Sequence, residues 1–101
     1  MIVLTVPAEE PVVLQGYIRE DSTKYNGKPR ITWNSVTGAK SYKVYRSLTG
    51  KAGTFFRIST ITNTSLTNTS TEAGKTYYYK VRAVYADDSK GEFSNVVKLT
   101  T

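Results

Sequence analysis

The sequence predicts an all-β fold, in which seven short strands form a two-sheet antiparallel β-sandwich, with a β-barrel as the alternative arrangement. The residue types favour strands, because the 101 residues include eight Tyr, three Phe and one Trp beside many Val, Ile and Thr. Seven short apolar runs are separated by turn signals such as Asn26-Gly27. No run has the 3.6-residue period of a helix, and no internal repeat occurs. A chain of this length is expected to form one domain.

The start of the chain is expected to lie outside the domain, with residues 1–10 as a linker or lead-in and residues 11–101 as the folded unit. Two prolines and two glutamates in residues 7–11 are typical of a stiff connection between domains. Residues 1–6 are apolar but too few for a signal peptide or a membrane span. No membrane insertion is therefore expected.

The first three strands are expected at residues 12–19, 30–34 and 41–47. In the first strand, Gly16 is a candidate β-bulge, because glycine has no side chain to pack. In the second and third strands, apolar and polar residues alternate, which is the pattern of a strand with one buried face. Trp33 is on the buried face of the second strand.

The remaining strands are expected at residues 55–61, around Leu66, at residues 76–85 and at residues 93–100. Leu66 interrupts a tract of Thr, Ser and Asn, which indicates a short edge strand. In the last strand two adjacent valines compete for the inward position, so its buried face stays open. The residues expected to form the core are Trp33, Tyr42, Val44, Leu66, Tyr77, Tyr79 and Val81.

Two stretches of the chain form recognisable motifs: Trp33 followed by VTGAKSYKVYR at residues 36–46, and AGKTYYYKVRAV at residues 73–84. They resemble the fibronectin type III family, in the variety common in bacterial surface proteins and multidomain carbohydrate-active enzymes. The resemblance covers residues 11–101. It implies an immunoglobulin-like seven-stranded sandwich, with Tyr77 as a tyrosine corner whose hydroxyl bonds a backbone group a few residues upstream. It also implies a bacterial protein that is extracellular, either secreted or on the cell surface.

The chain departs from the family pattern in two places. The family usually has a leucine six residues before the corner tyrosine, and here that position is Thr71, which buries less apolar area and is expected to loosen the corner. The loop that carries an Arg-Gly-Asp triplet in some animal members has the sequence DDSKG at residues 87–91, and the triplet occurs nowhere in the chain. Integrin binding is therefore not implied.

Catalytic and metal chemistry are not predicted. The chain has no Cys and no His, which removes thiolate nucleophiles, imidazole bases and the usual zinc ligands. Paired Asp87 and Asp88 suggest calcium, but the loop lacks the alternating oxygen donors of a dedicated site. No enzyme activity, metal or cofactor is expected. All eight acidic residues fall in expected loops or in the lead-in, and they are Glu9, Glu10, Glu20, Asp21, Glu72, Asp87, Asp88 and Glu92.

One surface is a candidate ligand-binding face. Pairing of the third and sixth strands as in the family would place basic and aromatic side chains side by side, an arrangement that stacks on sugar rings and attracts anions. The plainer interpretation is that long amphipathic residues commonly cover an exposed sheet. The net charge of +6 likewise suits either solubility or a polyanionic partner. The residues of this candidate face are Lys43, Tyr45, Tyr78, Lys80 and Arg82.

Three functions follow as hypotheses. The first is a non-catalytic spacer and interaction module, expected to be monomeric, whose partners are the neighbouring domains of a larger chain. The second is binding of a polysaccharide or cell-wall polymer through the candidate face. The third is protein binding through the loops near Gly38, Asn63 and Ser89, which this architecture gathers at one end. Nucleic acid is not an expected partner.

Overall fold

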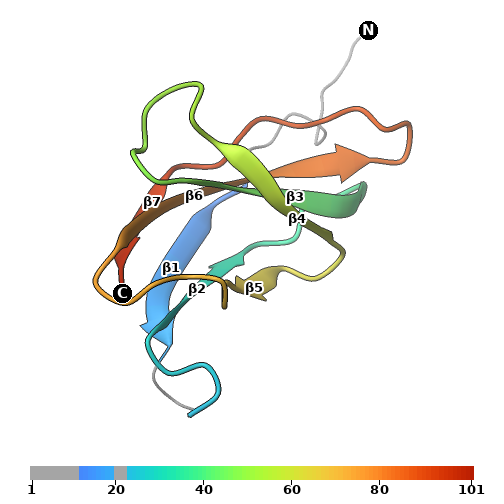
Figure 1. Ribbon diagram of the computed structural model, residues 1–101. Coiled ribbons are helices and arrows are strands. Elements are labelled where there is room, and N and C mark those ends of the chain that lie inside the picture. The colour runs from blue at the N-terminus through green and yellow to red at the C-terminus, as the bar shows by residue number, and fades with distance from the viewer. Residues whose placement is uncertain (1–11, 20–22) are drawn as a thin grey trace, which may run out of the picture.

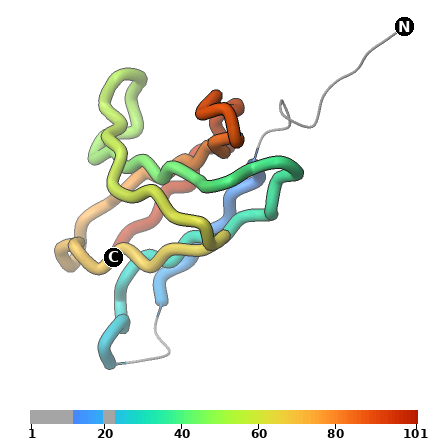
Figure 2. The backbone as a smooth tube through the Cα atoms, turned by 90° about the vertical axis from the view of Figure 1, so that its right-hand side faces the viewer, coloured from blue at the N-terminus to red at the C-terminus, as the bar shows by residue number. Residues whose placement is uncertain are grey.

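Alternating burial along the strands gives each of two antiparallel sheets one inward face, and the two inward faces pack together (Figures 1 and 2). The structure is a computed structural model that describes residues 12–19 and 23–101. One sheet has the order β1-β2-β5 and the other the order β4-β3-β6-β7. The strands are β1 (Leu14–Arg19), β2 (Lys28–Trp33), β3 (Ala39–Ser47), β4 (Phe56–Ile61), β5 (Ser65–Thr67), β6 (Thr76–Tyr85) and β7 (Val97–Thr100).

The two separate sheets confirm the seven-stranded sandwich and exclude the barrel. The short strand expected around Leu66 is β5, which pairs only with β2 and forms an edge. Nowhere in residues 12–19 and 23–101 does the chain form a helix able to cross a bilayer. The linker expected at residues 1–10 lies outside the described residues.

The core forms where β3 and β6, the central strands of one sheet, face β1 and β2 of the other. Tyr79, Val44 and Val81 are completely buried, and burial of side chains of this size stabilises the fold by about 1.5–3 kcal/mol each. The rings of Trp33 and Tyr42 meet edge to face across the sheets, with centroids 5.7 Å apart. Of the residues expected in the core, Trp33, Tyr42, Val44, Tyr77, Tyr79 and Val81 are buried, and Leu66 is partly buried against them.

The expectation of a bulge at Gly16 is wrong. β1 and β2 pair in continuous register from Leu14 to Arg19, so no extra residue is inserted. The glycine has a packing role instead, because a Cβ at this position would lie 3.0 Å from methyl groups of Val97 and Leu99, which would have to move slightly to admit it. Gly16 therefore allows the side chains of β7 to pack directly on the backbone of β1.

The last strand is shorter than residues 93–100, because the chain before Val97 follows β6 without forming a regular ladder. Ser94 contacts the backbone of Val81 twice, since its amide donates to the Val81 carbonyl and its Oγ accepts from the Val81 amide. Val97, the first residue of β7, packs against the core, whereas Val96, just before the strand, is 48% exposed. The inward position is therefore Val97.

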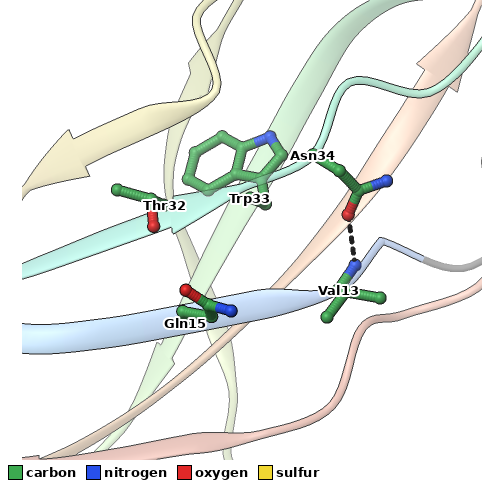
Figure 3. A pocket seen from close by; sticks show the side chains of 5 residues that line it. All are labelled: Val13, Gln15, Thr32, Trp33 and Asn34. Carbon is green, nitrogen blue, oxygen red and sulfur yellow. Dashed lines mark hydrogen bonds between the residues drawn. The ribbon is translucent and has the colours of Figure 1, made fainter.

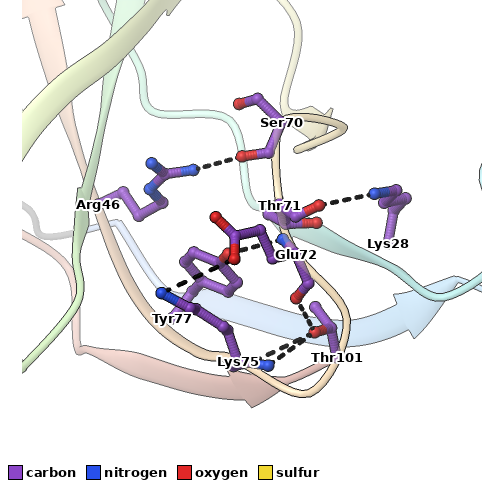
Figure 4. A network of polar contacts seen from close by, with 8 residues as sticks. All are labelled: Lys28, Arg46, Ser70, Thr71, Glu72, Lys75, Tyr77 and Thr101. Carbon is purple, nitrogen blue, oxygen red and sulfur yellow. Dashed lines mark hydrogen bonds and ion pairs between the residues drawn. The ribbon is translucent and has the colours of Figure 1, made fainter.

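The tyrosine corner is formed, and the loop between β5 and β6 is tied at several points (Figure 4). The amide of Glu72 donates a 2.8 Å hydrogen bond to the hydroxyl of Tyr77, as the family resemblance implied. The ammonium of Lys28 donates to the carbonyl of Thr71 at 2.9 Å. Thr71 Oγ1, in contrast, is buried and has no hydrogen-bond partner among the described residues. The backbone of this loop is thus well held, but the threonine hydroxyl is not satisfied.

Candidate functional site

The outward face of the four-stranded sheet brings together all five residues of the candidate binding face. Each of these residues alternates with a buried neighbour, so their side chains point away from the core. In the β3–β6 pairing, Lys43 lies opposite Arg82 and Tyr45 lies opposite Lys80. Tyr78 is two residues before Lys80 in β6, so its side chain lies on the same face.

The same face extends onto the two outer strands. Arg57 of β4 pairs with Tyr45, and Lys98 of β7 pairs with Tyr78. The sequence reasoning did not include these two cations, because it did not predict which strands flank the central pair. We call this surface the basic face, and its residues are Lys43, Tyr45, Arg57, Tyr78, Lys80, Arg82 and Lys98, together with the rings of Phe55 and Phe93.

The two phenylalanines hold the cations of β6. The ring centroid of Phe93 lies 3.9 Å from Lys80 Nζ and 4.0 Å from the guanidinium carbon of Arg82. Lys80 Nζ also lies 4.4 Å from the centroid of Phe55. Phe93 meets Tyr45 edge to face, with centroids 5.0 Å apart. The basic face is therefore a packed layer in which each ring already has a partner.

Sequence reasoning missed both phenylalanines, for different reasons. Phe93 was expected in the last strand, and its position over β6 depends on the irregular path before β7, for which the local sequence has no signal. Phe55 precedes Phe56, and adjacent residues of an extended chain point to opposite sides. That adjacency was a usable signal that one of the two rings faces outward with β3.

Tyr78 is less open than an exposed aromatic on a sheet. The loop between β3 and β4 folds over it, and a Cβ on Gly50 would come within 2.8 Å of the Tyr78 ring. Gly50 has a φ of 78°, a conformation that glycine adopts without strain. Tyr78 is consequently packed against backbone on the side where Gly50 lies.

The cations of the basic face have no carboxylate partner among the described residues. The ion pairs found in that part of the chain join Lys40 to Asp88 and Lys75 to Glu72, and neither includes a residue of the basic face. Arg82 instead donates from Nε to the carbonyl of Gly91 at 3.1 Å. The face therefore has several positive charges with no negative charge of the described chain paired to them.

The aspartates of the β6–β7 turn are held by protein donors. The amide and hydroxyl of Ser89 donate to Asp87 Oδ1, and these hydrogen bonds keep the pKa of Asp87 below its ordinary value of 3.8. The ammonium of Lys40 bonds Asp88 and lowers the pKa of that carboxyl. In the described ranges, no group of three or more His, Cys, Asp and Glu side chains is arranged to hold a metal ion.

Two shallow hollows lie elsewhere on the surface, and both are smaller than typical ligand pockets of about 300–1,000 Å³. The first has a volume of about 260 Å³ and lies where β1 begins and β2 ends, beside the hydrogen bond from the Val13 amide to Asn34 Oδ1 (Figure 3). The second, of about 280 Å³, lies beside β4 and is lined in part by Leu48 and by Phe56, whose side chain is 73% exposed.

The three loops of the protein-binding hypothesis lie around one end of the sandwich. The turn after β6 contacts the start of β3 through the Lys40–Asp88 ion pair, and Gly38 lies beside Tyr85. The β4–β5 loop bonds the end of β2, because the Trp33 amide donates to the carbonyl of Thr64. The loops near Gly38 and Ser89 adjoin each other, and binding of a protein by the three loops stays a prediction.

Comparison with known proteins identifies similar modules within bacterial proteins. A Fn3-like protein from Clostridium thermocellum has 34% sequence identity and a TM-score of 0.72, over 86% of this chain and 85% of that one. The β-1,2-glucanase of Parabacteroides distasonis matches 88% of this chain over 12% of its own, with 29% identity and a TM-score of 0.73. No family model matches the sequence.

An amylopullulanase from Thermoanaerobacter thermohydrosulfuricus is 39% identical over 74 residues. The match covers 72% of this chain, but this chain spans only 5% of the length of that enzyme. Two of these relatives are therefore much longer proteins, in which the similar segment is a small part.

Proposed function

Since this chain belongs to the fibronectin type III family, we propose that it is a non-catalytic accessory module that links and positions other domains of a larger, secreted or surface-bound bacterial carbohydrate-active protein. Its similarity to small parts of an amylopullulanase and a β-1,2-glucanase supports this setting. The absence of His and Cys from the sequence supports a role without catalysis.

The path of the chain through the sandwich is the observation that carries the proposal. β1 and β7 lie side by side and run in the same direction. Two contacts show this: Leu14 bonds the side chain of Asn95 before β7, and Gly16, further along β1, lies beside Leu99, further along β7. Leu14 bonds the side chain of Asn95, whose neighbour Ser94 bonds Val81 in the middle of β6, whereas Thr101 bonds Lys75, just before β6 begins.

The start of β1 and the C-terminus therefore lie well apart on the sandwich (Figure 1). Thr101 is six residues beyond Asn95, and at a rise of about 3.3 Å per residue this stretch spans roughly 20 Å. Domains attached at the two ends would be held apart by about that distance. A rigid separation is what distinguishes a folded spacer from a flexible linker.

The direct test places the chain between two fluorescent proteins and measures energy transfer between them. A folded spacer gives one narrow distance distribution that is unchanged by salt. The control replaces residues 12–101 with a Gly/Ser segment of equal length, which should give a broad distribution. An equally broad distribution for the folded chain would contradict the proposal.

The second test uses a parent enzyme in which the domain is flanked by others. Deletion of residues 12–101 should leave turnover of a small soluble substrate unchanged and alter activity on the polymeric substrate, because only the arrangement of the domains changes. Loss of turnover on the small substrate, with a catalytic domain that is still folded, would instead indicate that the module takes part in the chemistry.

A further inference from the structure

We propose that the basic face binds an acidic polysaccharide by its carboxylates, with Lys43, Arg57, Lys80, Arg82 and Lys98 as the contacting cations. This goes beyond the proposed function, because a spacer requires no ligand. It also differs from ring stacking on neutral sugars, because the recognised group is the carboxylate of each uronic acid unit.

Like charges lie next to one another on the basic face. Lys43 and Arg82 lie directly opposite each other on neighbouring strands, and like charges in that position destabilise a sheet. Lys80 is two residues from Arg82 on the same side of β6. No carboxylate of the described residues is paired with any of these three cations. A bound polyanion would supply the missing negative charge and relieve the repulsion.

Two aromatic rings preorganise the cations of β6. Phe93 has both the Lys80 ammonium and the Arg82 guanidinium within about 4 Å of its ring centroid, and Phe55 contacts the same ammonium. Long basic side chains lose conformational entropy when they are ordered. Here the aromatic contacts already order them in the free protein, so less entropy is lost when a ligand binds.

The basic face favours a ligand recognised by its charge over one that stacks on aromatic rings. The rings of the basic face are occupied by intramolecular contacts, since Phe93 contacts Tyr45 and two cations and Tyr78 is packed against Gly50. Neutral sugars and single-stranded nucleic acids both rely on open aromatic faces for stacking. The charges, in contrast, are spread over four strands about 4.8 Å apart. An extended chain with one carboxylate per sugar fits such a surface.

The experiment measures binding of polygalacturonate to the whole 101-residue chain by isothermal titration calorimetry at low and high salt. The test variant is Lys43→Gln with Arg82→Gln. The matched control, Lys24→Gln with Lys75→Gln, removes the same number of positive charges outside the basic face. Lys24 is in the β1–β2 turn, and Lys75 is the residue before β6. Neutral amylose and single-stranded DNA are the comparison polymers.

The proposal requires affinity for polygalacturonate that falls about tenfold or more when salt is raised from 50 to 200 mM, as binding to several charges does. The Lys43/Arg82 variant should lose about tenfold at low salt, and the control should lose less than about threefold. Amylose should not bind. A second variant, Lys80→Gln with Lys98→Gln, should reproduce the loss.

Three results would overturn the proposal. Equal losses in the test and control variants would show a response to net charge alone. Binding of amylose as tight as that of polygalacturonate would remove the carboxylate from the recognition. Tighter binding of DNA would assign the face to phosphate polymers. Thermal unfolding of each variant checks its fold, and loss of the like-charge pair should leave stability unchanged or raised.

Discussion

The hydroxyl of Tyr79 donates a 2.6 Å hydrogen bond to Oδ1 of Asn68, and this buried bond joins the two sheets of the sandwich. Tyr79 belongs to β6. Asn68 follows β5, and its backbone amide donates to the carbonyl of Pro29. Arg46 adds a second donor to the same Asn68 oxygen at 3.0 Å. Two strands that have no shared ladder are thus connected through one side chain.

Removal of this hydroxyl tests its contribution. Tyr79→Phe should lower the free energy of unfolding by about 1–2 kcal/mol, because a buried hydrogen bond is lost while Arg46 still satisfies Asn68. Denaturant unfolding measures the change. The control is Tyr17→Phe at a half-exposed position of β1, where the change should stay within about 0.5 kcal/mol. Similar effects in the two variants would count against a role for the buried bond.

The same phenol should make stability depend on alkaline pH. Burial raises the pKa of Tyr79 above its ordinary value of 10.0, so the folded protein holds this proton more tightly than the unfolded chain. The contribution is fully present below pH 10 and is lost as pH rises through the folded pKa, by about 1.4 kcal/mol per pH unit.

Unfolding measured from pH 8 to pH 11 on the protein and on Tyr79→Phe isolates this group, because the other titrations are shared. The difference in unfolding free energy between the two should be constant below pH 10 and shrink above it. A difference that does not change over the whole range would indicate that the phenol titrates equally in both states.

Gly16 should tolerate a methyl group poorly. In Gly16→Ala the added Cβ lies 3.0 Å from methyl groups of Val97 and Leu99, which requires the β7 side chains to move. We expect a loss of about 1–2 kcal/mol in unfolding free energy, as in other overpacked sites. In the background of Val97→Ala the same substitution should cost less, because space is then available. An equal cost in both backgrounds would mean that crowding by Val97 is not the cause.

Thr71 offers a route to higher stability. Its buried Oγ1 has no hydrogen-bond partner among the described residues, and such a group costs about 1–3 kcal/mol of desolvation. Thr71→Val keeps the shape and removes the hydroxyl, so the unfolding free energy should rise by about 1 kcal/mol. Exposed Thr69→Val is the control and should change little. A loss of stability in Thr71→Val would show that the hydroxyl has a partner in solution.

Most of the fold follows from local patterns in the sequence. A strand alternates its side chains between two faces, so the runs around Trp33, Val44 and Tyr79 predicted both the strands and the residues found buried in them. Glycine and asparagine marked the turns, and the observed strand ends differ from the expected ones by a few residues. The fold class was therefore predictable before any contact was known.

The candidate site was predictable only in its centre. The pairing of β3 with β6 followed from the family resemblance, and it placed Lys43, Tyr45 and Lys80 on one face. Arg57 and Lys98 could not be added, because the register of the outer strands depends on how the connecting loops close. Phe93 lies over β6 because Ser94 bonds the backbone of Val81, a contact outside any regular ladder.

The sequence by itself thus determined the fold class and the inward faces of the strands other than the last, because these depend on residues close together in the chain. Only the tertiary structure decided why Gly16 is a glycine, that Val97 and not Val96 faces inward, and that the rings of the basic face are already occupied. Each of these depends on side chains brought together from distant segments, as when β7 packs on the backbone of β1, and local alternation contains no information about such contacts.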